Sequence, residues 1–318
     1  MSQTLRLTGA IPANLLPFND DYSIDEPEYR KHLRWLADVP GVGSIVVNGH
    51  AAEVSALSRD ERKRALAIAV DEVGSRVNVI SGVISESTFE AGDLAADARA
   101  EGAAGVLVFP PALFLWGGNL RPEMAIAYYS HIADAGGLPI VLFQYPVQQG
   151  WGYTTELLLK LIEIEPVVAV KEWSQDIVVF ERNLKAIRST GRPVAVLSSF
   201  TASLYATFAL GADGAISGLG SVAADLQAEL FAAVQAGDPA RARQLSDRHN
   251  ALTEVFYAPP FLDMHNRMKE ALVALGRIRS ATVRPPLQAL SKPEQQAIRA
   301  ALLKAGLLPA RRPAGVTA

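Results

Sequence analysis

The sequence predicts an α/β protein in which eight parallel strands, each followed by a helix, close into a (β/α)8 TIM barrel. Short runs rich in Val, Ile and Leu recur along the chain, and each is followed by a longer stretch with helical spacing of apolar residues. Parallel strands buried on both faces have such near-continuous apolar runs. Right-handed crossovers that close after eight units favour a barrel. An open doubly wound sheet is the alternative.

Eight apolar runs mark the expected strands. They begin at Gly9, Val42, Val77, Ala104, Pro139, Val167, Pro193 and Gly214. Between them, residues 59–74 form an expected helix, with Ser58 as its N-cap and Glu61 completing a capping box. Residues 87–102 form another. The regular alternation of these runs and helices is the signature of repeated βα units.

The expected organisation is one structural domain with a C-terminal helical extension. A barrel typically needs about 250 residues, so the 318 residues leave room for additional elements. Residues 1–236 are expected to form the barrel and residues 237–308 to form helices packed on it. Within that extension the helices are expected over 239–254, 264–275 and 292–305. Residues 309–318, rich in Pro, Gly and small side chains, are expected to be a disordered tail.

Composition narrows the possible partners. Hydrophobic residues make up 49% of the chain and charged residues 20%, which suits a globular protein with a sizeable core. A formal net charge of −3, without basic runs, predicts neither a nucleic-acid nor a membrane partner. The absence of cysteine excludes disulfides, thiolate nucleophiles and cysteine-ligated metals. The N-terminal segment resembles no secretory signal and no apolar run reaches membrane-spanning length, so a cytoplasmic location is expected.

Polar residues at the ends of the apolar runs mark the expected site, because active sites of such barrels lie at the C-terminal ends of the strands. These residues are Asn48, Gly49, His50, Glu53, Tyr145, Lys171, Glu172, Ser198, Ser199 and Ser217.

Lys171 is the most informative of them. It follows VVAV directly, and strand alternation places it on the same face as Val167 and Ala169, toward the barrel mouth. A free lysine is neutral only about four times in ten thousand at pH 7, whereas a pKa of about 7 to 8 raises the reactive amine by roughly a hundredfold or more. Attack on a ketone requires that neutral amine. A lysine that enters solvent or pairs with a carboxylate is the structural alternative.

Tyr145 is expected to enter the mouth one strand away, where a phenol beside an imine could relay a proton. A tyrosine that caps the core is the alternative. His50 is a candidate acid–base group or an ordinary loop histidine. No histidine or carboxylate follows it in a metal-binding spacing, so no metal and no cofactor are expected.

The segment GAISGLGS is a candidate anion-binding turn. Ile216, Ser217 and Gly218 could offer backbone N–H groups to a carboxylate or phosphate before the following helix. A glycine turn with Ser221 as helix N-cap explains the same pattern equally well.

Four segments together resemble the dihydrodipicolinate synthase / N-acetylneuraminate lyase family of class I aldolases. They are FQYPV, VVAVKEW, GHAAEVSALSRDER and GADGAISGLGS, and the resemblance runs from about Leu7 to Leu308. It implies that Lys171 forms the Schiff base and that Tyr145 transfers protons. It further implies a small 2-oxo acid such as pyruvate as partner, with an aldehyde as a second reactant, and a homo-oligomer that is commonly a dimer of dimers.

The chain also departs from the family pattern. The carboxylate-gripping loop of the family, Gly-Thr-Thr-Gly-Glu or Gly-Ser-Thr-Gly-Glu, here runs from Gly49 to Glu53 as Gly-His-Ala-Ala-Glu. His50 could replace one hydroxyl as a donor, whereas Ala51 retains only its backbone N–H. The arginine with which the synthases recognise the aldehyde's carboxylate is replaced by Gly150. These differences argue against dihydrodipicolinate synthesis.

Aromatic residues near the expected mouth have two interpretations. Where the synthases lend a tyrosine to a neighbouring subunit, this chain has Phe114 and Trp116. Together with Trp151 and Trp173 they could form a wall for a sugar acid or an aromatic aldehyde, or they could be interface or core residues.

Three functions remain open at this point. The first is a Schiff-base aldolase that makes or breaks a carbon–carbon bond next to a 2-oxo acid. The second is a dehydratase that acts on a 2-oxo sugar acid through the same imine. The third is a binding protein for 2-oxo acids that has lost its proton relay, and fold resemblance alone does not separate them.

Overall fold

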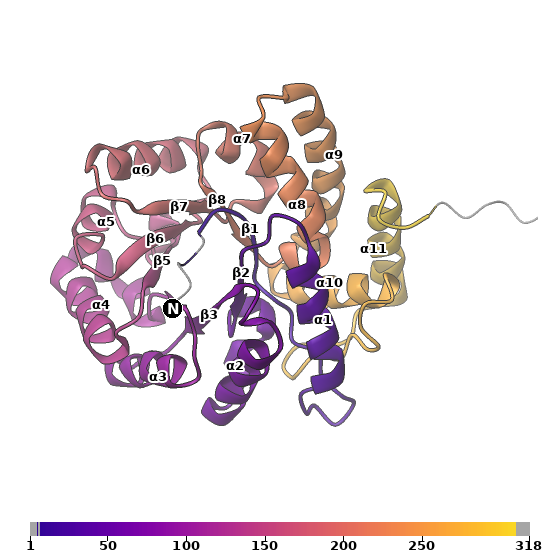
Figure 1. Cartoon of the computed structure of the whole chain (residues 1–318), viewed down its shortest axis with the longest axis horizontal. Coiled ribbons are helices and arrows are strands. Elements are labelled where there is room, and N and C mark those ends of the chain that lie inside the picture. The colour runs from indigo at the N-terminus through magenta and orange to yellow at the C-terminus, as the bar shows by residue number, and fades with distance from the viewer. Residues whose placement is uncertain (1–4, 6, 310–318) are drawn as a thin grey trace, which may run out of the picture.

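The computed structural model describes residue 5 and residues 7–309, apart from the side chain of Asn119. Eight parallel strands form one sheet in the order β1-β8-β7-β6-β5-β4-β3-β2, surrounded by helices (Figure 1). The strands are β1 (Gly9–Pro12), β2 (Ser44–Val47), β3 (Asn78–Val83), β4 (Gly105–Val108), β5 (Ile140–Gln144), β6 (Val167–Glu172), β7 (Ala195–Ser198) and β8 (Gly214–Ser217). Each of them lies within one of the eight predicted runs.

The sheet closes between its first two strands. An isolated parallel bridge joins Ala13, just after β1, to Val46 in β2. The N–H of Asn14 donates to the carbonyl oxygen of Val46 at 2.9 Å. The predicted barrel is therefore confirmed, and the open-sheet alternative is wrong.

Helices cover the outside of the barrel (Figure 1). They are α1 (Glu26–Asp38), α2 (Arg59–Val73), α3 (Thr88–Ala100), α4 (Pro122–Gly136), α5 (Thr155–Leu161), α6 (Ile177–Ser189), α7 (Leu204–Ala209) and α8 (Gly220–Gln235). The predicted capping box at α2 is present, because the Ser58 side chain accepts from the Glu61 N–H while the Glu61 carboxylate accepts from the Ser58 N–H. Ser87 caps α3 in the predicted place. No helix among the described residues is both long enough and apolar enough to cross a membrane.

Three further helices follow the barrel in the predicted places. They are α9 (Pro239–Phe256), α10 (Met264–Ala274) and α11 (Lys292–Lys304), of which α9 packs on α8 and α11 packs on α9 and α10. The division into a barrel and an extension stays a prediction. The predicted disordered tail lies outside the described residues except for Pro309.

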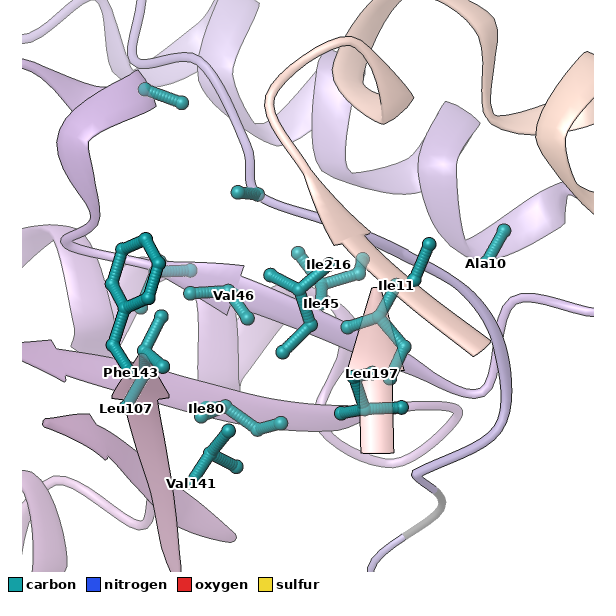
Figure 2. Close-up of a cluster of buried hydrophobic side chains, with 14 of the residues drawn as sticks. Ala10, Ile11, Ile45, Val46, Ile80, Leu107, Val141, Phe143, Leu197 and Ile216 are labelled. Atoms are coloured by element: carbon teal, nitrogen blue, oxygen red, sulfur yellow. The ribbon is translucent and has the colours of Figure 1, made fainter. Parts of the chain in front are cut away.

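The barrel interior is filled by apolar side chains from almost every strand (Figure 2). Among those that are fully buried are Ile11, Ile45, Val46, Ile80, Leu107, Val141, Leu197 and Ile216. Phe143 of β5 and Leu197 of β7 pair in register with Lys171 of β6 from either side. Since the packed core occupies the barrel below this level, a ligand can enter only from the C-terminal ends of the strands.

Candidate active site

A cavity of about 150 Å³ lies above the core at the C-terminal ends of the strands. A void of roughly this size accommodates a benzene-sized molecule, that is, about six non-hydrogen atoms. Its walls include Lys171, Phe143, Gly49, His50 and Gly218. The predicted lysine, the predicted loop and one residue of the predicted glycine turn therefore meet around one space.

Lys171 is the penultimate residue of β6 and is only 8% exposed. Its Nζ lies 3.9 Å from the centre of the Phe143 ring and 5.9 Å from that of Phe109. No carboxylate of the described residues forms an ion pair with it. Burial among these rings lowers the pKa of Lys171 to about 7, because the charged ammonium loses its hydration. About half of the amine is then neutral at pH 7.

Tyr145 follows β5 and contacts His50, a residue that lines the cavity. Its side chain is 3% exposed, and its hydroxyl forms a 2.7 Å hydrogen bond with Nε2 of His50. The rings of Phe143, Trp151 and Trp173 surround it at centroid distances of 4.3, 4.9 and 5.3 Å. Burial raises the pKa of Tyr145 well above 10, so the phenol is neutral and can serve as a donor.

His50 opens a short 3-10 helix, η1 (His50–Ala52), and keeps part of its surface open to solvent. Its ring meets the Phe109 ring edge-on at 4.8 Å. Desolvation of the ring, followed by the nearby charge of Lys171, lowers the pKa of His50 below its usual 6.5. A neutral imidazole therefore bridges the buried phenol and the outside.

Contacts with Arg62 and with β3 fix the loop that carries His50. Asn48 adopts a left-handed conformation with φ 54°, and its Nδ2 donates to the carbonyl oxygen of Arg62 at 3.0 Å. A Cβ on Gly82 of β3 would lie 2.1 Å from the carbonyl oxygen of Asn48, so only glycine allows this approach. Gly49 and Ala51 then border the cavity as predicted.

Glu53 joins this loop to the C-terminal helices. Its Oε1 accepts from Nζ of Lys269 in α10 at 2.5 Å, and its Oε2 accepts from the N–H of Arg284 at 2.8 Å. Both side chains of the Glu53–Lys269 pair are almost fully buried. The pair fixes α10 above the barrel mouth.

Several predicted strand-end residues face away from the cavity, because neighbouring residues of a strand point to opposite faces. Glu172 accepts from Asn183 Nδ2 at 3.0 Å, and this contact anchors α6 to β6. The Ser198 hydroxyl accepts from Thr207 at 2.9 Å. Neither side chain borders the cavity, whereas Ser199 does.

The glycine turn after β8 differs from the prediction at three positions. Ile216 is fully buried in the barrel core, and the Ser217 hydroxyl accepts from Gln227 Nε2 at 2.9 Å, so neither residue lines the cavity. The alternative interpretation, in which Ser221 caps the helix, is also wrong, since α8 starts at Gly220 without a side-chain cap. The Ser221 hydroxyl instead accepts from the N–H of Leu15 at 2.8 Å.

The four aromatic residues of the expected wall divide into two groups. Trp173 lines the cavity, and Trp151 packs on Tyr145 at the mouth. Phe114 is buried against Tyr128, and Trp116 is 89% exposed, so neither reaches the site.

The strand-end rule missed residues that the C-terminal segment brings to the cavity. Tyr257, Phe261, Met264 and His265 all line it. Burial, with the charges of His50, Lys269 and Lys171, lowers the pKa of His265 to about 3. No local pattern in the sequence identifies them, because they follow no strand. Among the described residues, no group of His, Asp and Glu is arranged to hold a metal ion.

Comparison with known proteins decides the family. The profile of the Dihydrodipicolinate synthetase family matches residues 6–305. The chain belongs to this family. It is a lyase, and the alternative of a non-catalytic binding protein is therefore wrong.

Individual relatives match over nearly the whole chain. A 4-hydroxy-tetrahydrodipicolinate synthase of Methanopyrus kandleri is 34% identical over 96% of this chain and 98% of its own length. The putative 2-dehydro-3-deoxy-D-gluconate aldolase YagE of Escherichia coli is 28% identical over 95% of this chain and 98% of its own. The crystal structure of YagE in complex with pyruvate matches with a TM-score of 0.86 at 27% identity, covering 95% and 99% of the two chains. The dihydrodipicolinate synthase structure from Aquifex aeolicus matches with a TM-score of 0.84 at 26% identity, again over 95% and 99%.

The first of these relatives carries the name of the synthase itself. This match does not support the expectation that the chain differs from a true dihydrodipicolinate synthase.

Proposed function

We propose that this lyase binds a 2-oxo acid, pyruvate in the simplest case, as a Schiff base on Lys171 and makes or breaks the adjacent carbon–carbon bond. The observation that carries the proposal is the buried, unpaired amine of Lys171, which faces a cavity of about 150 Å³. Pyruvate has six non-hydrogen atoms, and a void of roughly this volume suits a ligand of that size.

The chemistry follows from a neutral amine and a neutral phenol at one end of the barrel. The Lys171 amine attacks the ketone carbon of the 2-oxo acid, and loss of one water leaves a protonated imine. In the cleavage direction, a base removes the proton from the hydroxyl on C4, the C3–C4 bond breaks, an aldehyde leaves and the electron pair enters the imine to form an enamine. Protonation of C3 and addition of water then release pyruvate and the free amine. Bond formation is the reverse sequence.

Tyr145 is the proposed proton carrier. Its neutral hydroxyl is hydrogen-bonded to His50, which lines the Lys171 cavity, and this bond gives the proton a path outward. His50 remains partly open to solvent, so this path lies within one subunit. The proposed role of Gly49, His50, Ala51 and Gly218 is to hold the substrate's carboxylate with backbone and imidazole N–H groups.

We further propose that the chain does not take the aldehyde of the dihydrodipicolinate synthases. By the resemblance described above, Gly150 falls where the synthases have their arginine. It has φ 83°, a conformation that disfavours residues with a side chain. A Cβ there would also lie 2.8 Å from the carbonyl oxygen of Leu115. The loop is built around glycine at this point, so an arginine could not be restored without rebuilding it.

Oligomeric state and cellular location stay predictions. An exposed apolar group after β4, with Leu113 50%, Trp116 89% and Leu120 79% exposed, supports association of copies of this chain. Sedimentation velocity would test this; a monomer at micromolar concentration would contradict it.

The experiment that tests the proposal is intact-mass spectrometry after incubation with pyruvate and sodium borohydride. The expected product carries one reduced pyruvate adduct, located on Lys171 by peptide mapping and absent from Lys171→Ala. Full turnover by Lys171→Ala would refute the mechanism. A 2-oxo sugar acid that loses water without releasing pyruvate would instead indicate the dehydratase.

A further inference from the structure

A second hollow, of about 490 Å³, continues outward from the Lys171 cavity. The two spaces share walls formed by His50, Trp173, Phe261, Met264 and His265. We call this second space the outer chamber. A second reactant has to approach the substrate on Lys171 from this side. The part of that reactant that does not react would then lie in the outer chamber.

The walls of the outer chamber are mostly apolar. Trp151, Trp173, Phe261 and Leu262 border it, together with Pro285. The rings of Trp173 and Phe261 stack with their centroids 6.1 Å apart and an interplanar angle of 19°. Phe261 is 39% and Leu262 61% exposed, so part of their apolar surface remains open at the chamber.

The arginine that borders the chamber has no free hydrogen-bond donor. A guanidinium has five N–H groups. Those of Arg284 donate to the Tyr22 carbonyl oxygen from Nε and Nη2, to the Ala56 carbonyl oxygen from Nη1, and to the two carboxylate oxygens of Glu61. Binding a carboxylate in the chamber would require Arg284 to break some of these bonds.

The remaining charges around the chamber are likewise engaged. Glu53 is held by Nζ of Lys269 and by the N–H of Arg284, and the Lys269 ammonium also donates to the carbonyl oxygen of Thr282 at 2.8 Å. Lys269 is fully buried over the Phe18 ring. Apart from Lys171 itself, the described residues around the two spaces therefore offer no free cation to an anionic reactant.

We infer that the second reactant is an aldehyde whose substituent is uncharged and apolar, with an aromatic ring as the best fit to the wall formed by Trp151, Trp173 and Phe261. This inference rests on the proposed Schiff-base function and adds the chemical class of the reactant. A carboxylate in the chamber would lose its hydration without gaining a cation, which is costly. A ring gains apolar burial and face-to-face or edge contacts with the tryptophans.

The test has two independent parts. Exchange of the pyruvate methyl hydrogens for deuterium, followed by NMR, reports imine and enamine formation at Lys171 without any aldehyde. Addition of benzaldehyde, 4-oxobutanoate or glyceraldehyde then compares aromatic, carboxylate and polyhydroxy reactants by kcat/KM for bond formation. Benzaldehyde is expected to exceed 4-oxobutanoate by about tenfold or more, since one apolar contact in a pocket is worth about ten- to 200-fold.

Two variants test whether the preference for benzaldehyde arises in the outer chamber. Leu262→Ala should lower kcat/KM for benzaldehyde about tenfold relative to the exchange rate of the same variant. The matched control is Leu303→Ala in α11, a 39% exposed leucine away from both spaces, which should leave both rates unchanged.

The outcomes separate the two proposals. Normal exchange with equal or faster reaction of 4-oxobutanoate would overturn the apolar reactant and leave the Schiff base standing. Loss of exchange would overturn the Schiff-base function. The preference of the outer chamber for an apolar ligand would then be tested by measuring ligand binding alone. For that measurement the tryptophan fluorescence is titrated with benzyl alcohol and with 4-hydroxybutanoate; tighter binding of the carboxylate would overturn the inference.

Discussion

The amine of Lys171 should titrate near neutral pH, and raising the pH from 5 to 10 is the perturbation that shows it. Burial lowers its pKa from the usual 10.5 to about 7. This difference corresponds to about 5 kcal/mol between the charged and neutral forms. At pH 7 it raises the neutral fraction about a thousandfold over an unperturbed lysine.

The rate of Schiff-base formation at Lys171 is expected to rise with pH. Attack on pyruvate requires the neutral amine, so the rate should rise about tenfold per pH unit below pH 7 and level off above it. Pyruvate stays ionised throughout this range. The assay is the initial rate of cyanoborohydride trapping at low pyruvate, quantified at Lys171 by peptide mapping. Lys304, whose side chain is 69% exposed, serves as an internal reference in the same sample.

The two lysines should respond differently. Reductive alkylation of Lys304 should continue to rise toward pH 10, whereas trapping at Lys171 should not. If both rates rise in parallel up to pH 10, the Lys171 amine has an ordinary pKa and the argument from burial is refuted.

Three further predictions follow from the same contacts. Lys171→Met should raise the free energy of unfolding at pH 7 by up to about 4 kcal/mol, measured by denaturant titration, because the unfolded wild-type chain binds a proton that the folded chain has released. This gain should be full up to about pH 7 and disappear as the pH rises toward 10.5. Tyr145→Phe should retain trapping but lose about 10²- to 10⁴-fold in turnover, measured with the same substrate pair. Gly82→Ala should lower the free energy of unfolding by roughly 3 kcal/mol, since its Cβ would meet the carbonyl oxygen of Asn48. Gly49→Ala is its control, because the Cβ there would lie an ordinary 3.8 Å from the nearest side chain.

Each of these predictions has an outcome that contradicts it. A pH-independent stability difference between wild type and Lys171→Met would show that Lys171 is not neutralised on folding. Unchanged turnover in Tyr145→Phe would remove the phenol from the proton path. Equal stability of the two glycine variants would mean that the loop after β2 adapts without cost.

The residues that the sequence placed correctly are those whose position follows from local rules. Alternation along β6 and β5 sets the direction of Lys171 and Tyr145, because neighbouring strand residues face opposite sides. The caps of α2 and α3 follow from serine at the N-cap.

Tertiary structure alone decided which other side chains reach the cavity. Ser217 lies at the C-terminal end of its strand, yet it faces outward, where Gln227 binds it. His265 belongs to a helix that follows the barrel, and the buried pair of Glu53 and Lys269 brings that helix over the mouth. The Glu53–Lys269 pair joins residues 216 positions apart, so no local period encodes it. The sequence by itself determined the barrel and the position of Lys171 at its mouth, because periodicity and strand direction are local; the pKa of that lysine and the apolar chamber above it depend on long-range packing.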